Sequence, residues 1–284
     1  MGKYRKILIA IDGSESSKNA LKQAIKLAND EKCWITVVSV MPPYEGELEL
    51  VGVKNIRAAI KKPCEDALVE AEKISETEGR SIKTVCEEGE VYERIVGIAE
   101  AENCGIIVMG RRSKSRFERS LIGSVTARVI GHSQRDVLIV PEGTAIGWKN
   151  ILLTTDGSRY SEAAAEKAID FAKSYGGELK VISVIDVPPE YYAEAPKAVE
   201  DLIKKAKGFV GNLKEKAEAS NISTETFVGE GDAYKVITDL AKKEKADVIF
   251  MGSHGRTGIK RLLMGSVTEG VIGHAPCPVL IVRS

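Results

Sequence analysis

The stretch that decides the fold is Gly252-Ser253-His254-Gly255, followed after nine residues by Gly265-Ser266-Val267. It follows an apolar run, residues 246–251 (ADVIFM), that predicts a buried strand, and it precedes residues 267–274, which predict a short helix. Glycines that leave a strand open the backbone N–H groups to a ligand, and a helix N-terminus favours negative charge. The spacing therefore indicates an anion site, with a turn glycine and a serine helix cap as the structural alternative.

The chain repeats itself at long range. Residues 7–14 (ILIAIDGS) return as residues 151–158 (ILLTTDGS), a shift of 144 positions, and residues 123–126 (GSVT) return as residues 265–268, a shift of 142. A period of this length predicts two domains and not a solenoid. The Pro/Gly stretch at residues 141–147 predicts the boundary, which gives domains of residues 1–143 and 147–284.

Strands and helices are predicted to alternate in both halves. Strands are expected at residues 6–11, 34–40, 81–86, 106–109 and 137–140, and again at 150–155, 178–185, 223–228, 247–251 and 279–282. This alternation implies parallel sheets covered by helices on both faces, and ligands bind such sheets beyond the strand C-termini. Four candidate residues end strands in this way: Asp12, Gly110, Asp156 and Gly252.

Composition excludes several classes of protein. Among the 284 residues, 41 Lys and Arg balance 41 Asp and Glu, so no globally basic footprint for nucleic acid exists. No signal peptide or apolar run near membrane-spanning length is present, so we expect no membrane partner. Five widely spaced cysteines without C-x-x-C predict reduced, mostly buried thiols in a cytoplasmic protein: Cys33, Cys64, Cys86, Cys104 and Cys277.

The glycine spacing resembles that of one known family. No G-x-G-x-x-G follows the first strand, and no P-loop motif is present. The residues are similar to the universal stress proteins, whose nucleotide-binding members carry G-x2-G-x9-G-[ST]. The second half matches fully, with Gly252, Gly255, Gly265 and Ser266. The first half has Gly110, Gly123 and Ser124, with Ser113 in place of the second glycine. The resemblance covers both halves of the chain.

This resemblance implies two tandem, doubly wound, Rossmann-like α/β domains, each with five parallel strands in the order 3-2-1-4-5. It also implies an adenine nucleotide, ATP or AMP, with Mg²⁺ or Mn²⁺ held only through its phosphates. The Asp that ends strand one would lie near adenine or ribose, the end of strand two would contact adenine, and the glycine loop would hold phosphates. The implied ligand residues are Thr155, Asp156, Val184, Met251, Gly252, His254, Gly255, Gly265, Ser266 and Val267, and in the first half Ile11, Asp12, Val40, Gly110, Arg112, Gly123, Ser124 and Val125.

Each of these residues also has a structural interpretation. Asp at a strand-to-helix turn often caps backbone amides, and arginines in a loop are often only solvated. His254 either reaches a phosphate or faces water, whereas His132 and His274 end helices and are interpreted as structural. Gly255 would let backbone approach a phosphate and adopt positive φ, a freedom that Ser113 reduces. We therefore expect the second site to be the better one.

Catalysis has no recognisable apparatus in the sequence. We find no Walker-B-like acid, no kinase catalytic loop and no nucleophile–base pair. The leading hypothesis is a nucleotide-binding, stress-response regulator without efficient catalysis. The alternatives are a slow ATPase that uses Asp156 with a phosphate-bound metal, and a dimerisation scaffold without ligand. The resemblance further implies that the last strands of the two halves, residues 136–140 and 278–282, pair within the chain, that the chain forms a homodimer, and that an unknown protein partner reads the signal.

Overall fold

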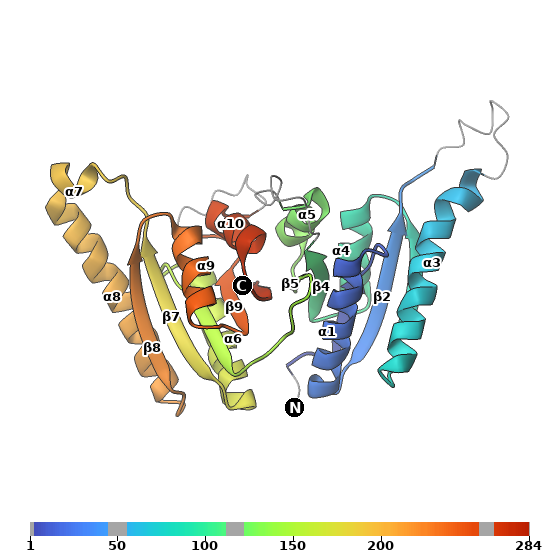
Figure 1. The fold of residues 1–284 in the computed structure, drawn as a ribbon, viewed down its shortest axis with the longest axis horizontal. Coiled ribbons are helices and arrows are strands. Elements are labelled where there is room, and N and C mark those ends of the chain that lie inside the picture. Colours follow the sequence, from blue (N-terminus) through green and yellow to red (C-terminus); the bar gives the residue numbers. More distant parts are fainter. Residues whose placement is uncertain (1–2, 45–55, 112–121, 256–263, 284) are drawn as a thin grey trace. The chain divides into compact units, whose positions relative to one another are not determined.

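The computed structural model describes residues 3–44, 56–111, 122–255 and 264–283 (Figure 1). Contacts divide these residues into two compact units. Of the described residues, unit 1 contains 3–44, 56–111 and 123–144, and unit 2 contains 122, 145–255 and 264–283. Each unit is described by itself.

Unit 1 is a parallel sheet with helices between its strands. Its strands pair in the order β3-β2-β1-β4-β5, all in parallel. The elements are β1 (Lys6–Ala10), α1 (Glu15–Glu31), β2 (Trp34–Met41), α3 (Ile56–Thr77), β3 (Lys83–Glu88), α4 (Val91–Ala101), β4 (Ile106–Arg111), α5 (Ser124–His132) and β5 (Asp136–Pro141).

Unit 2 repeats this topology. Its strands pair in the order β10-β9-β6-β7-β8, again all in parallel, which is the same strand order in reverse listing. The elements are β6 (Asn150–Thr154), α6 (Arg159–Tyr175), β7 (Glu178–Ile185), α7 (Tyr191–Glu194), α8 (Pro196–Glu218), β8 (Thr224–Glu230), α9 (Ala233–Lys243), β9 (Val248–Gly252), α10 (Ser266–His274) and β10 (Val279–Val282). The predicted α/β class and the order 3-2-1-4-5 are confirmed.

The central strands form the core because helices cover both faces of each sheet. In unit 1, α1 contacts α3, while α4 contacts α5. The β1 residues Ile7, Leu8 and Ile9 are completely buried between these layers. This explains the continuous apolar run, since a strand covered on both faces has no solvent side. Helix α3 continues through Pro63.

One expectation about the cysteines is wrong. Cys64 of α3 and Cys86 of β3 form a disulfide, with Cα atoms 6.2 Å apart. The spacing of cysteines along a chain does not reveal which side chains the packing of a helix on a sheet brings together. Cys33, Cys104 and Cys277 are buried thiols outside this disulfide, as expected. Burial raises the pKa of the Cys33 and Cys104 thiols to about 11.

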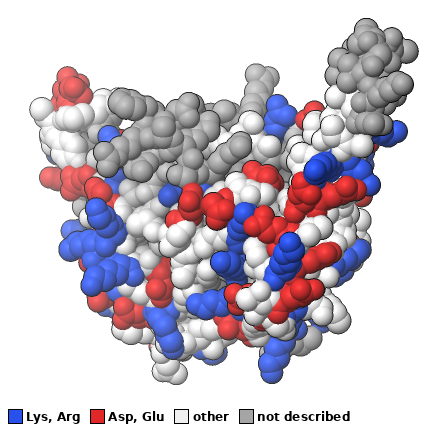
Figure 2. Space-filling model, turned by 45° about the vertical axis from the view of Figure 1, so that its right-hand side comes forward, with Lys and Arg blue, Asp and Glu red and all other residues white. Residues whose placement is uncertain are grey.

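The surface of the described residues carries mixed charge. Figure 2 shows lysines and arginines interspersed with aspartates and glutamates on the face it draws. No helix in the described ranges is long and apolar enough to cross a membrane.

Candidate functional site

The Asp-Gly-Ser turn after the first strand is built in the same way in both units. In unit 2, Asp156 Oδ1 accepts a hydrogen bond from the Ser158 amide at 3.0 Å, and Gly157 takes a φ of +74°. Ser158 then caps α6 by accepting from the Ser161 amide. The capping interpretation of Asp156 is therefore correct for one carboxylate oxygen, which leaves the role of the other oxygen to be judged from its surroundings.

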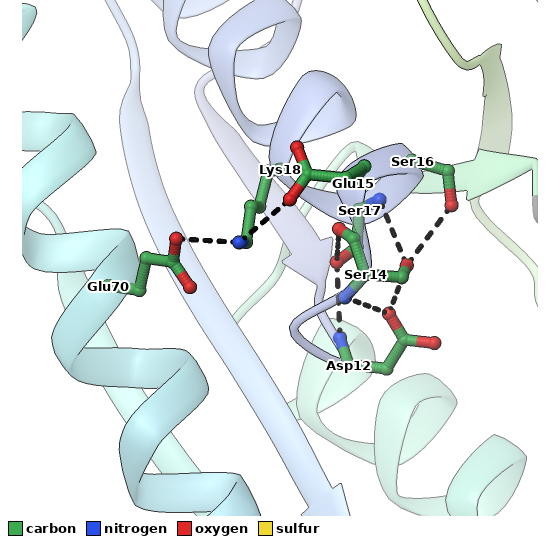
Figure 3. A network of polar contacts seen from close by, with 7 residues as sticks. All are labelled: Asp12, Ser14, Glu15, Ser16, Ser17, Lys18 and Glu70. Atoms are coloured by element: carbon green, nitrogen blue, oxygen red, sulfur yellow. Dashed lines mark hydrogen bonds and ion pairs between the residues drawn. The ribbon is translucent and has the colours of Figure 1, made fainter.

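The unit 1 turn shows the same chemistry in a denser polar network (Figure 3). Asp12 Oδ1 accepts from the amide and hydroxyl of Ser14, whose hydroxyl also contacts Ser16 Oγ at 3.1 Å. Beside this turn, Lys18 bridges Glu70 and Glu15 at 2.6 and 3.0 Å. The hydrogen bond to Glu70, with a smaller one to Glu15, raises the pKa of Lys18. In unit 2 the position of Ser16 is taken by Tyr160.

The first glycine of each motif allows close packing of a helix. A Cβ added to Gly252 would lie 2.7 Å from the Tyr160 carbonyl carbon, and one added to Gly110 would lie 2.5 Å from the Ser16 carbonyl oxygen. Because backbone atoms of α6 and α1 occupy this space, the absence of a side chain serves the fold. These two glycines therefore do not, by themselves, indicate a ligand.

The absence of a side chain at Gly255 has a different explanation. Its φ lies outside the left-handed region, so the positive φ that glycine would permit is not adopted there. A Cβ added there would lie 2.9 Å from Asp156 Oδ2. The glycine thus lets the second carboxylate oxygen of Asp156 lie against the loop. Ser113 and Arg112, on which the comparison with unit 1 depends, lie outside the described residues.

The N-terminus of α10 presents backbone amides. Gly265 is its N-cap, with φ −73° and ψ 148°, and makes no side-chain cap. The Gly265 amide donates to the Ser253 carbonyl at 3.1 Å, and Thr268 Oγ1 donates to the Gly252 carbonyl at 3.2 Å. These two bonds tie the helix start to the glycine loop. Glycine has no side-chain oxygen, so the N-cap residue does not cap the amides of Ser266 and Val267. An anion site requires such uncapped amides.

These elements surround a cavity of about 570 Å³ in unit 2. All ten residues predicted for this half line it: Thr155, Asp156, Val184, Met251, Gly252, His254, Gly255, Gly265, Ser266 and Val267. Its other walls were not predicted. Ser183 and Asp186 come from the end of β7 and the turn that follows it, Leu202 and Ala206 come from α8, and Ile237 comes from α9. The four-residue spacing of Leu202 and Ala206 is the sequence signal that could have indicated this wall.

His254 is held on the cavity by its neighbours. Its Nδ1 lies 3.1 Å from Ser253 Oγ, and its ring lies 5.4 Å from the Tyr160 ring. Arg159 stacks over Tyr160 at 4.7 Å and donates to its hydroxyl at 2.8 Å. His274 differs, because its Nδ1 contacts the Gly270 carbonyl of its own helix, in agreement with a structural role.

Unit 1 places its candidate residues at matching positions. The Ile11 amide donates to Val38 O and the Thr155 amide to Ile182 O, each at 2.9 Å, so both chains leave the first strand alike. Gly123 is the N-cap of α5 with φ −56° and ψ 138°, again without a side-chain cap, and Ser124 and Val125 follow it. Val40 of β2 lies one residue beyond Ser39, which pairs with Cys86, and Val184 of β7 lies one residue beyond Ser183, which pairs with Val228. The two valines therefore occupy matching positions in the two sheets.

Comparison with known proteins agrees with this geometry. A family model described as the universal stress protein family matches residues 3–141 and again residues 147–283. The chain belongs to the universal stress protein family. A universal stress protein of Methanocaldococcus jannaschii is 39% identical over 140 residues, which cover 48% of this chain and 82% of that protein.

Solved structures of universal stress proteins support the tandem fold. One from Archaeoglobus fulgidus aligns over 99% of this chain and 97% of its own, with a TM-score of 0.76 and 24% identity. Another universal stress protein was solved in complex with cAMP, and it aligns over 48% of this chain and 97% of its own with 23% identity and a TM-score of 0.39. The first structure shows the fold of this chain. The TM-score of the second is too low to support a conclusion about this chain.

Proposed function

We propose that this universal stress protein binds an adenine nucleotide, ATP or AMP, in unit 2 and acts as a stress-response regulator without efficient catalysis. The observation that carries the proposal is the cavity of about 570 Å³ that joins the start of α10 to the end of β7. Small-molecule and cofactor sites typically have volumes of about 300–1,000 Å³, mostly apolar walls and a few placed polar groups.

The two parts of the cavity suit the two parts of a nucleotide. At the loop and the α10 start, backbone amides and the helix dipole favour phosphate. The wall from β7 and α8 is largely apolar, with Ile182, Val184 and Leu202, and suits a purine ring. Asp156 follows β6, which lies between β9 and β7 in the sheet, and a carboxylate oxygen there can accept from ribose hydroxyls. The lining therefore changes from an apolar wall suited to the base, through a carboxylate suited to ribose, to backbone amides suited to phosphate.

A slow metal-dependent ATPase is the second candidate, and the position of Asp156 favours it. Its Oδ2 atom lies beside Gly255, so a bound triphosphate would bring negative charge close to this carboxylate. Mg²⁺ or Mn²⁺ carried by the phosphates would offset that repulsion, and Asp156 is the carboxylate placed to hold it. Among the described residues that line the cavity, the other acid is Asp186, which accepts a hydrogen bond from the Ala233 amide.

The decisive experiment is small-molecule mass spectrometry of purified, denatured protein, followed by calorimetric titration with ATP and AMP. We expect a co-purified adenine nucleotide or, after its removal, one tight site per chain. Absence of co-purified nucleotide, together with no heat of binding up to about 1 mM, where the binding free energy falls to about −4 kcal/mol, would contradict the proposal. Phosphate release at about 1 per second or faster would instead favour the ATPase.

The wider role rests on this site. We propose that nucleotide occupancy of the regulator is read by a protein partner, and that the chain works as a homodimer in the cytoplasm. Size-exclusion chromatography with light scattering, with and without ATP, tests the dimer. A scaffold without ligand stays as the alternative for unit 1, whose second motif position lies outside the described residues.

A further inference from the structure

The disulfide of unit 1 joins a helix to the outermost strand of its sheet. Cys64 lies in α3 and is 4% exposed, whereas Cys86 lies in β3 and is partly exposed. Among the described strands of unit 1, β3 is the last in the strand order and pairs only with β2. Cys86 is therefore the more exposed residue of the pair, and Cys64 is the more buried one.

The internal repeat identifies the residues of unit 2 that are equivalent to the cysteine pair. Cys86 pairs in register with Ser39, and the corresponding pair in unit 2 is Val228 with Ser183. The helix position of Cys64 corresponds to Ala206, by the 142-residue shift that also relates Gly123 to Gly265. Ala206 and Ser183 both line the unit 2 cavity.

Contacts confirm this helix correspondence. Ala67 lies 3.7 Å from the Cβ position of Gly13, and Phe209 lies 2.4 Å from that of Gly157, so both face the turn after the first strand. Cys64 and Ala206 come three residues earlier on their helices. The cysteine pair therefore stands at the wall of unit 1 that matches the base-binding wall proposed for unit 2.

The surroundings suit both oxidation states. The Cys64 sulfur lies 3.3 Å from the Ser39 carbonyl oxygen, which can accept a hydrogen bond from the thiol after reduction. The free cysteines of unit 1, Cys33 and Cys104, are buried, and burial raises the pKa of both thiols, so they offer little thiolate for exchange.

We propose that Cys64 and Cys86 form a reversible thiol–disulfide exchange site whose co-reactants are small disulfides and dithiols. In oxidation, the Cys86 thiolate attacks a small disulfide, forms a mixed disulfide and expels one thiolate. The Cys64 thiolate then attacks the Cys86 sulfur and expels the second, so two protein thiols become one disulfide and the small disulfide becomes two thiols. Reduction runs the same steps in reverse, with two small thiols supplying one thiolate each or one dithiol supplying both.

We extend this proposal to the wall of the unit 1 site, which the exchange changes. This extension rests on the proposed nucleotide binding. Two thiol sulfurs need a non-bonded separation, whereas a disulfide draws its two elements together. Reduction therefore lets α3 move away from β3 and widens the wall, and the reduced form binds ATP more tightly in unit 1.

The exchange site is tested by maleimide labelling of the full chain in glutathione buffers of increasing oxidation, with peptide mapping. We expect adducts on Cys86 and Cys64 that disappear together as the buffer becomes oxidising, while Cys33 and Cys104 stay unlabelled. The matched control is the double variant Cys64→Ala/Cys86→Val, which carries the unit 2 residues. Oxidation is expected to raise the melting temperature of the wild type by about 5–10 °C and that of the control not at all. Labelling that is independent of the buffer would overturn the proposal.

The coupling is tested by ATP titration of the oxidised and reduced forms, with Ser266→Pro to weaken the unit 2 site. We expect about fivefold or greater tightening at the remaining site on reduction, and no change in the Cys64→Ala/Cys86→Val control. Equal affinities would refute the coupling. Loss of all ATP binding in wild type would refute the proposed function, while the labelling result would still decide the exchange site.

Discussion

Proline at position 266 is expected to weaken nucleotide binding in unit 2 without unfolding α10. Ser266 is the first residue of this helix, where proline removes an amide that has no partner within the helix. Gly265, with φ −73° and ψ 148°, already has the extended conformation that a residue before proline prefers. Ser266→Pro therefore removes one amide and one hydroxyl from the cavity and leaves the backbone path unchanged.

The size of the effect follows from the charge of the ligand. A hydrogen bond to a charged group contributes about 1.5–3 kcal/mol, and each 1.4 kcal/mol corresponds to about tenfold in affinity. Ser266→Ala removes the hydroxyl alone. We therefore expect Ser266→Pro to raise the dissociation constant of ATP about 10- to 100-fold above that of Ser266→Ala, the difference being the contribution of the amide.

Calorimetric titration of the two variants measures this difference, with circular dichroism and melting temperature as checks on the fold. The matched control is Ser124→Pro against Ser124→Ala at the start of α5, where Gly123 has φ −56° and ψ 138°. We expect this pair to affect only a weaker site. Equal affinities for the two Ser266 variants would refute phosphate binding at α10. Loss of the tight site in Ser124→Pro alone would refute the ranking of the two units.

Three further predictions test the fold. Gly252→Ala should destabilise unit 2 by about 1–3 kcal/mol through contact with α6, whereas Gly208→Ala, with open space around it in α8, should stabilise it by about 0.5–1 kcal/mol; thermal unfolding compares them. Burial opposes ionisation of Glu102, but hydrogen bonds from two lysines and a threonine hold its pKa at about 2, below its ordinary 4.5. Its stabilising effect should be complete above pH 4.5 and fade toward pH 2, so the unfolding free energies of wild type and Glu102→Gln should converge in acid. We also expect residues 136–140 and 278–282 to pair within one chain, and fast amide exchange in both segments would contradict this.

Much of the fold could be predicted because its signals are local. The apolar run of β7 predicted its bounds, Glu178–Ile185, to the residue. α7 was missed because a single turn, Tyr191–Glu194, is too short to show a helical period. The limits of residues 1–143 and 147–284 as independent domains stay a prediction.

Two signals predicted the ten candidates that line the cavity. The glycine spacing marked the loop and the α10 start, which are neighbours in the chain, whereas the family resemblance supplied Thr155, Asp156 and Val184 from other strands. The spacing of Leu202 and Ala206 marks a helix face, but that this face of α8 packs against the cavity depends on how the helix crosses the sheet, which local spacing does not encode. The Cys64–Cys86 disulfide was missed for the same reason, since it also joins a helix to a strand.

The two units together show which motif residues argue for a ligand. Asp12 and Asp156 recur, and so do Gly110 and Gly252, but the turn hydrogen bonds and the packing of the next helix explain both pairs without any ligand. Repetition alone therefore supports the fold. Gly255 does not recur, and neither a turn nor a positive φ requires it. A Cβ there would meet only the second carboxylate oxygen of Asp156 at the edge of the cavity, and not the backbone of a helix as at Gly110 and Gly252. The residue that differs between the units, and not those they share, is therefore the stronger argument for the proposed binding in unit 2.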